Sequence, residues 1–345
     1  MNEAWQEVLT AWRLAEAGRW DEAMDVSRGC GDLSAVLAQR ARQGGPDVYP
    51  VLAGWRAYYK AEYQSALAEF LDQLRTSEEG GWLTAWATLG VAKIASDCGR
   101  WRSALNWCAC AWRCAAKGEH VDLLAQIVGA RGEILLRAGA ASESAAAFAE
   151  DLALLPSGSR YRGRVRCYQA HAYARLGPHG EKAAQLAYRL AIHSPGEAGT
   201  ASFATAGLAL LAARMRNPAL LAETRGRQLQ GLAQFWSAVA GARLANDDGD
   251  RRHHIAEAAS SLPQFYFAER WWLAGWAEAL GIRVFEAPIL HGTLGFELPT
   301  APVRPMTRVE DPVPADEIED APWWGIFPIL KDPEAWWGIR NAFMP

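Results

Sequence analysis

Apolar residues in the first half of the chain recur at the three- and four-residue spacing of amphipathic helices. The spacing predicts five pairs of helices, most of them about 15 residues long, which corresponds to about 22 Å. The predicted helices cover residues 3–17 and 20–26, 48–59 and 63–74, 83–98 and 101–116, 123–138 and 143–155, and 160–176 and 181–192. Each pair alone has too little core to be stable, so the pairs are expected to stack on one another.

The turns inside these pairs share a short pattern, seen best at Gly99, Trp101 and Ala104. Glycine tolerates the positive φ that ends a helix, and alanine lets the second helix approach the first closely. Related turns occur at Gly18, Ala61, Gly139 and Gly177. With Gly99, these points are separated by 43, 38, 40 and 38 residues. A period near 40 with two helices in each copy indicates a solenoid.

Small and aromatic residues also recur at matching places in several pairs. They are Gly54, Ala66 and Phe70 in the second pair, Ala92 and Ala104 in the third, and Gly132, Phe148 and Pro156 in the fourth. The arrangement resembles the tetratricopeptide repeat family, in a longer-period variant like those of bacterial regulatory proteins, since that family's usual period is about 34. The resemblance covers roughly residues 1–195. It implies an all-α, right-handed superhelical solenoid of antiparallel helix pairs and a scaffold or adaptor function.

Further helices are predicted over 201–215, 220–244, 251–261 and 264–280. The last contains Trp271, Trp272 and Trp276 and is apolar almost all round, whereas a terminal repeat should have a polar outer face. The following segment is the obvious cover for it, and it includes a candidate hairpin around His291. We therefore expect repeats over 1–199, helices completing the solenoid over 200–281, and an extended tail over 282–345.

The tail combines prolines, acidic residues and a duplicated tryptophan motif. Residues 310–320 contain six acidic side chains, and the string Trp-Trp-Gly-Ile follows at 323 and again at 336. Paired tryptophans are favoured interface anchors, and two copies on one tether allow bivalent binding. The motif residues are Trp323, Trp324, Ile326, Phe327, Trp336, Trp337 and Ile339. They are expected either to cap the protein's own solenoid or to recruit a partner.

The formal net charge of −4 is distributed unevenly. Residues 1–159 carry −5, 160–260 carry +7, 261–299 carry −2 and 300–345 carry −4. Candidate binding residues in the basic segment are Arg160, Arg162, Arg164, Arg166, Tyr168, Arg214, Arg225 and Arg252. Three interpretations remain open for them: solvated arginines, a site for an acidic peptide or the acidic tail, and a nucleic-acid surface. The pI near 6.0 argues against strong nonspecific DNA binding.

No sequence pattern of a known active site is present: there is no phosphate-binding glycine loop, nucleophile elbow or zinc-protease string. Cys108, Cys110 and Cys114 cannot all face one ion from a regular helix, so we expect small buried hydrophobes rather than a metal site. The N-terminus lacks the features of a signal peptide, and no apolar run is long enough to span a membrane.

The sequence therefore predicts a cytoplasmic protein that is not an enzyme and has no cofactor or metal. It is expected to bind another protein or a peptide, with its own tail as one candidate ligand. The alternative is a nucleic-acid-associated regulatory protein that uses the arginine-rich region 160–252.

Overall fold

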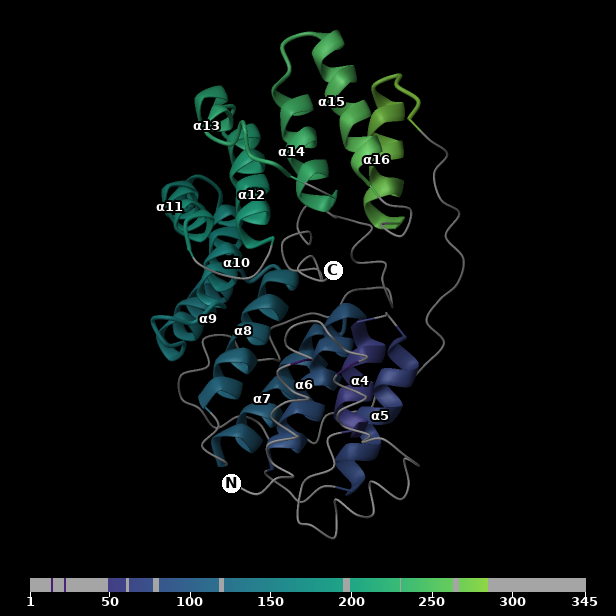
Figure 1. The fold of residues 1–345 in the computed structure, drawn as a ribbon, viewed down its shortest axis with the longest axis vertical. Helices are drawn as coiled ribbons and strands as arrows, with labels where there is room; N and C mark the ends of the chain where they lie inside the picture. Colours follow the sequence, from purple (N-terminus) through teal and green to yellow (C-terminus); the bar gives the residue numbers. More distant parts are fainter. Residues whose placement is uncertain are drawn as a thin grey trace. The chain divides into compact units, whose positions relative to one another are not determined.

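The computed structural model describes residues 49–59, 62–76, 81–117, 121–194, 199–229, 231–262 and 267–284, together with Leu14 and Glu22. Across these ranges the regular structure is helical, which confirms the predicted all-α class (Figure 1). No helix in the same ranges has both the length and the apolarity to cross a bilayer. Apart from Leu14 and Glu22, which are both helical, the predicted first helix pair lies outside the described residues, as does the tail beyond Val284.

The chain divides into two compact units, and the helices of unit 1 lie before the boundary at Ile127. Its described helices are α4 (Tyr49–Tyr59), α5 (Tyr63–Thr76), α6 (Trp82–Asp97) and α7 (Trp101–Lys117), followed by the start of α8 (Val121–Arg137). Helix α4 packs on α5, α5 on α6, and α6 on α7. Helix α4 also contacts α6, so the first helices of successive pairs stack as in a helical repeat.

Unit 2 begins at Val128 and follows the same plan. After α8 its helices are α9 (Ala141–Leu154), α10 (Arg162–Arg175), α11 (Glu181–Ile192), α12 (Thr200–Arg214), α13 (Pro218–Ala222), α14 (Gly231–Leu244), α15 (Asp248–Ser261) and α16 (Phe267–Ala279), with one 3-10 turn at Gly177–His179. Consecutive helices pack together, and α10 contacts α12 as α12 contacts α14. The predicted boundary near residue 200 stays a prediction.

Glycines end several helices as the turn pattern predicted. Gly99, Gly139 and Gly177 have φ values of 74°, 88° and 64°, a region that L side chains rarely adopt. At the first two turns the next amide bonds back into the helix: Arg100 donates to the Ala95 carbonyl and Ala140 to the Leu135 carbonyl, both at 2.9 Å. This pattern satisfies carbonyls that the helix end would leave unpaired.

The predicted helix over 220–244 is wrong. The chain instead forms α13 and α14, and residues 223–229 between them are not helical. Gly226, inside this break, has a φ of 79°, which the interior of a right-handed helix cannot contain, and Gly231, the first residue of α14, has a φ of 54°. The apolar spacing continues across this break, so periodicity alone could not show it.

Aromatic rings of the second helix in a pair lie against glycines of first helices. Phe70 of α5 lies between Gly54 of α4 and Gly90 of α6, where an added Cβ would come within 2.5 and 2.3 Å of its ring. Phe148 lies against Gly132, where an added Cβ would come within 2.8 Å of the ring. These are the glycine and phenylalanine positions that carry the repeat resemblance, and their contact lets the helices approach closely.

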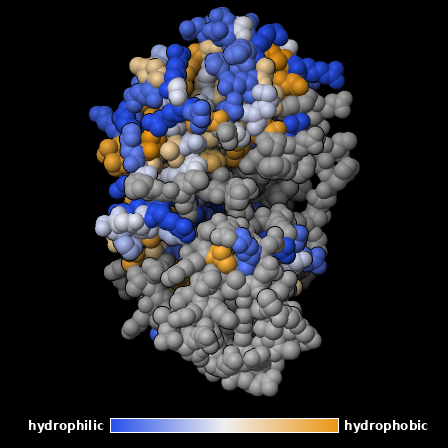
Figure 2. Space-filling view, in the orientation of Figure 1, coloured by the Kyte–Doolittle hydropathy of each residue, from blue (hydrophilic) through white to orange (hydrophobic). Residues whose placement is uncertain are grey.

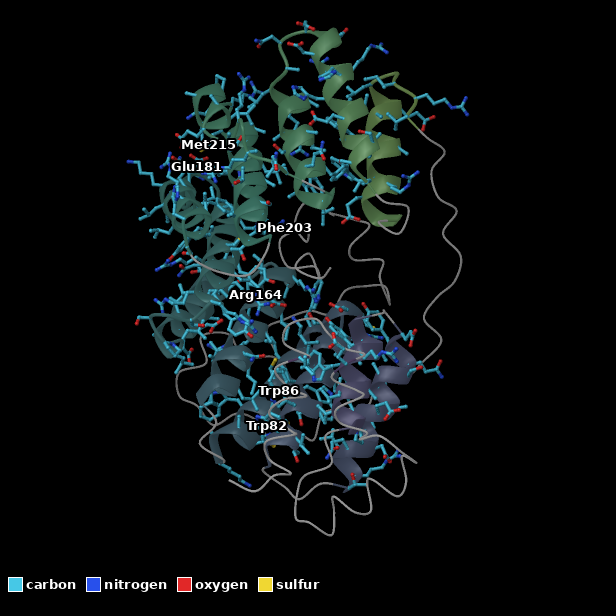
Figure 3. The ribbon with its side chains drawn as sticks, viewed as in Figure 1. Trp82, Trp86, Arg164, Glu181, Phe203 and Met215 are labelled. Carbon is cyan, nitrogen blue, oxygen red and sulfur yellow. The ribbon has the colours of Figure 1, made fainter. Side chains whose placement is uncertain are left out.

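A buried carboxylate joins three helices of unit 1. Asp97 at the end of α6 accepts hydrogen bonds from Tyr58 of α4 at 2.8 Å and from Tyr63 of α5 at 3.2 Å. Near the other end of α6, Trp86 packs edge-on against Trp55 and Trp82, with ring centroids 5.8 and 6.5 Å away; Trp82 and Trp86 are labelled in Figure 3. The hydrogen bonds compensate the cost of burying the carboxylate, so the site is accounted for by structure alone.

We predict opposite effects on stability for the same substitution at two glycines of unit 2. In Gly207→Ala the new Cβ would lie 2.3 Å from the Tyr188 ring, so the free energy of unfolding should fall by about 1–3 kcal/mol. Gly275→Ala, in an exposed position of α16 with no atom within 4 Å, should raise it by about 0.5–1 kcal/mol. Urea unfolding of both variants checks this, and a shift of the same sign in both would contradict the packing argument.

Candidate functional site

One of the candidate binding residues, Arg162, bonds to the end of α9. Arg162 donates from one guanidinium nitrogen to the carbonyls of Leu152 and Leu155, both at 2.7 Å. These carbonyls lie at the end of α9, where they need donors from outside the helix. The Arg162 side chain is therefore used within the fold.

Two further members of this run have internal partners. Arg166 donates to the Ser194 hydroxyl at 2.8 Å, and that hydroxyl donates to the Leu190 carbonyl at 2.6 Å. Tyr168 is buried, with its ring 5.6 Å from that of Phe148. Sequence spacing could not distinguish these roles from surface roles, because it does not show which groups lie beside each side chain.

Arg160 and Arg164 gather around one aromatic ring. Their guanidinium carbons lie 4.9 and 5.1 Å from the centroid of the Tyr161 ring, and Arg160 also donates to the Tyr161 hydroxyl at 2.7 Å. Arg160 is exposed and Arg164 is half-buried; Arg164 is labelled in Figure 3. This pair keeps its charge near the surface, where an acidic ligand could contact Arg160.

Arg214, Arg225 and Arg252 are all exposed. Arg214 ends α12, Arg225 follows α13, and Arg252 lies on α15. On the face drawn in Figure 2, hydrophilic residues predominate over the described part of unit 2, with smaller hydrophobic areas between them. The predicted basic residues are therefore spread over several helices, and they stay candidates rather than an established site.

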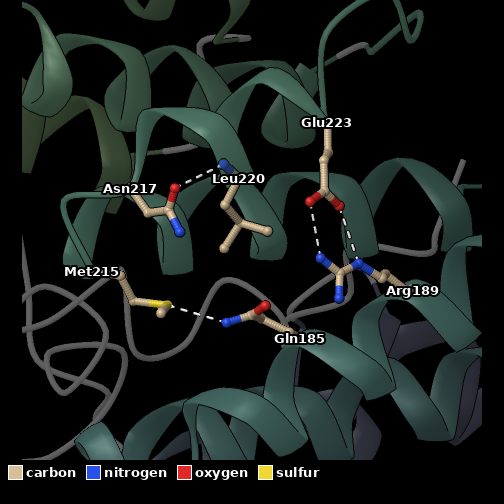
Figure 4. Close-up of polar contacts among 6 residues, drawn as sticks. All are labelled: Gln185, Arg189, Met215, Asn217, Leu220 and Glu223. Atoms are coloured by element: carbon tan, nitrogen blue, oxygen red, sulfur yellow. Dashed lines mark hydrogen bonds and ion pairs between the residues drawn. The ribbon is translucent and has the colours of Figure 1, made fainter.

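Polar contacts join α11 to the segment around α13 (Figure 4), and α11 also carries two exposed leucines. Arg189 forms two bonds to the Glu223 carboxylate, at 2.9 and 3.1 Å, and Gln185 contacts the Met215 sulfur at 3.5 Å. Leu186 and Leu190 are 59% and 45% exposed, the two largest values among the large hydrophobic residues described. Sequence analysis missed this pair, although their spacing places them on one helical face.

A buried acid lies behind the arginine-rich turn. Asp151 of α9 is almost fully buried, and a Cβ added at Gly129 of α8 would lie 2.6 Å from its carboxylate. Burial raises the pKa of the Asp151 carboxyl to about 7, and Glu133 and Glu150 add to this rise, while Arg164 and Arg162 oppose it. The burial of Asp151 could not be predicted from the sequence, because exposed and buried positions of a helix cannot be distinguished until its packing is known.

The aromatic helix α16 packs against α14. The Trp272 and Trp276 rings stack with centroids 5.4 Å apart, and Trp272 lies 5.4 Å from Trp236. The Arg243 guanidinium lies 5.8 and 6.0 Å from the Trp272 and Trp276 ring centroids. Gly275 and Glu278 of the same helix are exposed.

The cysteines of the described residues lie mainly in the core. Cys98, Cys108, Cys110 and Cys167 are buried, and Cys114 is half-buried. Burial raises the pKa of the Cys98 and Cys167 thiols to about 12, which keeps them protonated and unreactive at neutral pH. Among the side chains that the structure describes, no cluster of three His, Cys, Asp or Glu could hold a metal ion.

Asp247 caps the start of α15, because its side chain accepts a hydrogen bond from the Asp250 amide at 2.8 Å. The tail motif from Trp323 to Ile339 lies outside the described residues.

Comparison with protein-family models, curated proteins and solved structures returned no match.

We predict that Asp151 makes the protein less stable as the pH rises from about 4 to about 7. Well below pH 4 the carboxyl is protonated in both states; between the unfolded pKa and the folded pKa, mainly the unfolded state ionises, and this favours unfolding. Asp151→Asn should therefore be more stable than the parent at pH 8, by at most about 4 kcal/mol, and should match it most closely near pH 4.

Urea unfolding at several pH values from 4 to 8 measures this difference. Glu278→Gln, at an exposed position of α16, is the matched acid-to-amide control and should leave the pH profile unchanged. A difference between Asp151→Asn and the parent that does not vary with pH would show that the carboxyl ionises normally in the folded protein.

Proposed function

We propose that the protein is a non-enzymatic helical-repeat scaffold, with a right-handed solenoid of the tetratricopeptide type, that binds an acidic peptide or protein segment. The stacking of first helices within each unit supports a repeat architecture. So does the recurrence of a ring sixteen positions after a glycine, at 54 and 70 and again at 132 and 148, with the two in contact each time.

The observation that carries the binding proposal is the set of exposed cations on unit 2. Arg214, Arg225 and Arg252 all reach solvent, whereas Arg162 and Arg166 are used inside the fold. Exposed cations on a rigid framework attract acidic segments and orient them before contact. The most acidic segment of this same chain is 310–320, which directly precedes the first tryptophan motif.

In this proposal the tail acts as an internal ligand. It occupies its site on the helices until a partner with a similar acidic and aromatic segment displaces it, or it recruits that partner itself. Nucleic-acid binding receives less support, because an aromatic residue of the arginine-rich run, Tyr168, is buried, and Arg162 and Arg166 are bound to internal acceptors. A nucleic-acid surface needs such groups free to reach phosphates and bases.

We predict that a labelled peptide of residues 310–345 binds the full chain in which Trp323, Trp324, Trp336 and Trp337 are changed to alanine. Binding to the unchanged chain should be at least about tenfold weaker, since its own tail competes at high local concentration. Fluorescence anisotropy at 50 and 300 mM salt measures both affinities. Single- and double-stranded DNA serve as competing probes in the same assay.

A peptide in which the four tryptophans are alanine is the matched control and should not bind. Absence of binding by the natural peptide to either protein would contradict the proposal. Stronger binding of DNA than of peptide, with a steep loss between the two salt concentrations, would favour the nucleic-acid alternative.

A further inference from the structure

We propose that the exposed face of α11 is the docking site for the acidic tryptophan segment 316–327 of the same chain. This assignment rests on the proposed function, and it adds the place where the internal ligand binds. The face is centred on Leu186 and Leu190 and includes the neighbouring cations of α11 and of the turn after α13. We refer to it as the α11 face.

The apolar part of the α11 face is unusual for a solvent-facing helix surface. The buried side of α11 is formed by small and aromatic residues, namely Ala184, Ala187, Tyr188, Ala191 and Ile192. Leu186 and Leu190 point the other way, one helical turn apart, and are exposed over about half of their surface. In Figure 2 hydrophobic atoms appear at the margin of unit 2, level with α11 in Figure 1. Two adjacent exposed leucines offer an anchor point for aromatic rings.

Cations surround this leucine pair. Lys182 is exposed and lies on the same side of α11 as Leu186, four positions before it. Arg189 ties α11 to Glu223, which brings the turn after α13 alongside, and that turn carries exposed Arg225 and Arg227. A ligand that suits this face therefore has acidic side chains next to large apolar ones.

Segment 316–327 has this composition. Asp316, Glu317, Glu319 and Asp320 are followed within a few residues by Trp323, Trp324, Ile326 and Phe327. A second copy of the α11 face is a poor occupant, because a symmetric contact would place its lysine and arginines against their own copies. Charge complementarity therefore favours the tail segment over self-association.

The tether is long enough for this contact. The described chain ends at Val284, which packs against the hydrophobic core of unit 2, the unit that contains α11. About 40 residues separate Val284 from Trp323, which gives a flexible chain an average span of about 35 Å. A folded unit of this size is about 40 Å across, so the segment can reach α11 without strain.

The Trp272–Trp276 surface of α16 is a weaker site for the tail. Both rings are partly buried, stack on each other and lie near Arg243, and Ile282 and Val284 pack against the same core. Most of the apolar area there is already in contact with the protein's own residues. On the α11 face, by contrast, Leu186 and Leu190 are 59% and 45% exposed.

Proteolysis of the full chain after lysine tests the assignment, because Lys331 is the tail's only lysine and lies between the two tryptophan motifs. Docking of segment 316–327 should shield Lys331. The double variant Leu186→Ser with Leu190→Ser should accelerate its cleavage at least about tenfold, as should Trp323→Ala with Trp324→Ala. Leu280 is the third exposed large hydrophobic residue among those described. Leu280→Ser is therefore the matched control and should leave the rate of cleavage at Lys331 unchanged.

Photo-crosslinking identifies the occupant directly. Leu186→benzoylphenylalanine in the full chain should crosslink within one molecule to residues 316–327, read by mass spectrometry. The same probe at exposed Arg252 should not reach that segment. Because both leucines are exposed, circular dichroism should show the serine variant folded like the parent.

Three outcomes would overturn the assignment. If the tryptophan variant accelerates cleavage and the leucine variant does not, the tail docks elsewhere, so the proposed function stands and the α11 site fails. Crosslinks only between molecules would make the occupant another copy's tail. If neither variant changes cleavage and the labelled tail peptide also fails to bind, the proposed function fails together with the site.

Discussion

The packing of an aromatic ring of one helix onto glycines of its neighbours is the contact on which the rest of the fold depends. Phe70, Phe148 and Tyr188 each lie against at least one glycine of a first helix, and an added Cβ would come within 3 Å of every ring. Helices that approach this closely bury nearly all the polar positions along the contact. This explains why buried groups such as Asp97 have hydrogen-bonding partners supplied by neighbouring helices.

The fold was largely predictable because these contacts require glycine and aromatic residues at particular positions in the sequence. Within the described ranges, apolar spacing predicted most helices to within a few residues, and the glycine turns at 99, 139 and 177 have the positive φ expected of them. The prediction was wrong at the break before α14, because the apolar spacing continues through Gly226.

The candidate site was much less predictable, because it depends on which hydrogen-bond acceptors of neighbouring helices lie close to each arginine. The run from Arg160 to Arg166 reads as one basic surface, yet Arg162 binds carbonyls at the end of α9 and Arg166 binds Ser194. Such acceptors appear only when two helices are placed side by side. Leu186 and Leu190 carried a detectable signal, since the small residues of α11 already indicate its buried side. The sequence alone could not show that both leucines are exposed, because their exposure depends on how α11 packs against α10 and α12.

Burial also changes the charge that a ligand meets on unit 2. The formal net charge of residues 160–260 is +7, a value that already includes the acidic side chains of that segment. Glu223 binds Arg189 and Glu150 binds Arg131, but Asp151, with its pKa near 7, is about half protonated at neutral pH. The unit is therefore more positive near pH 7 than its residues suggest. An acidic segment of the same chain can balance this charge at a lower entropic cost than a separate molecule, because its binding costs little translational freedom.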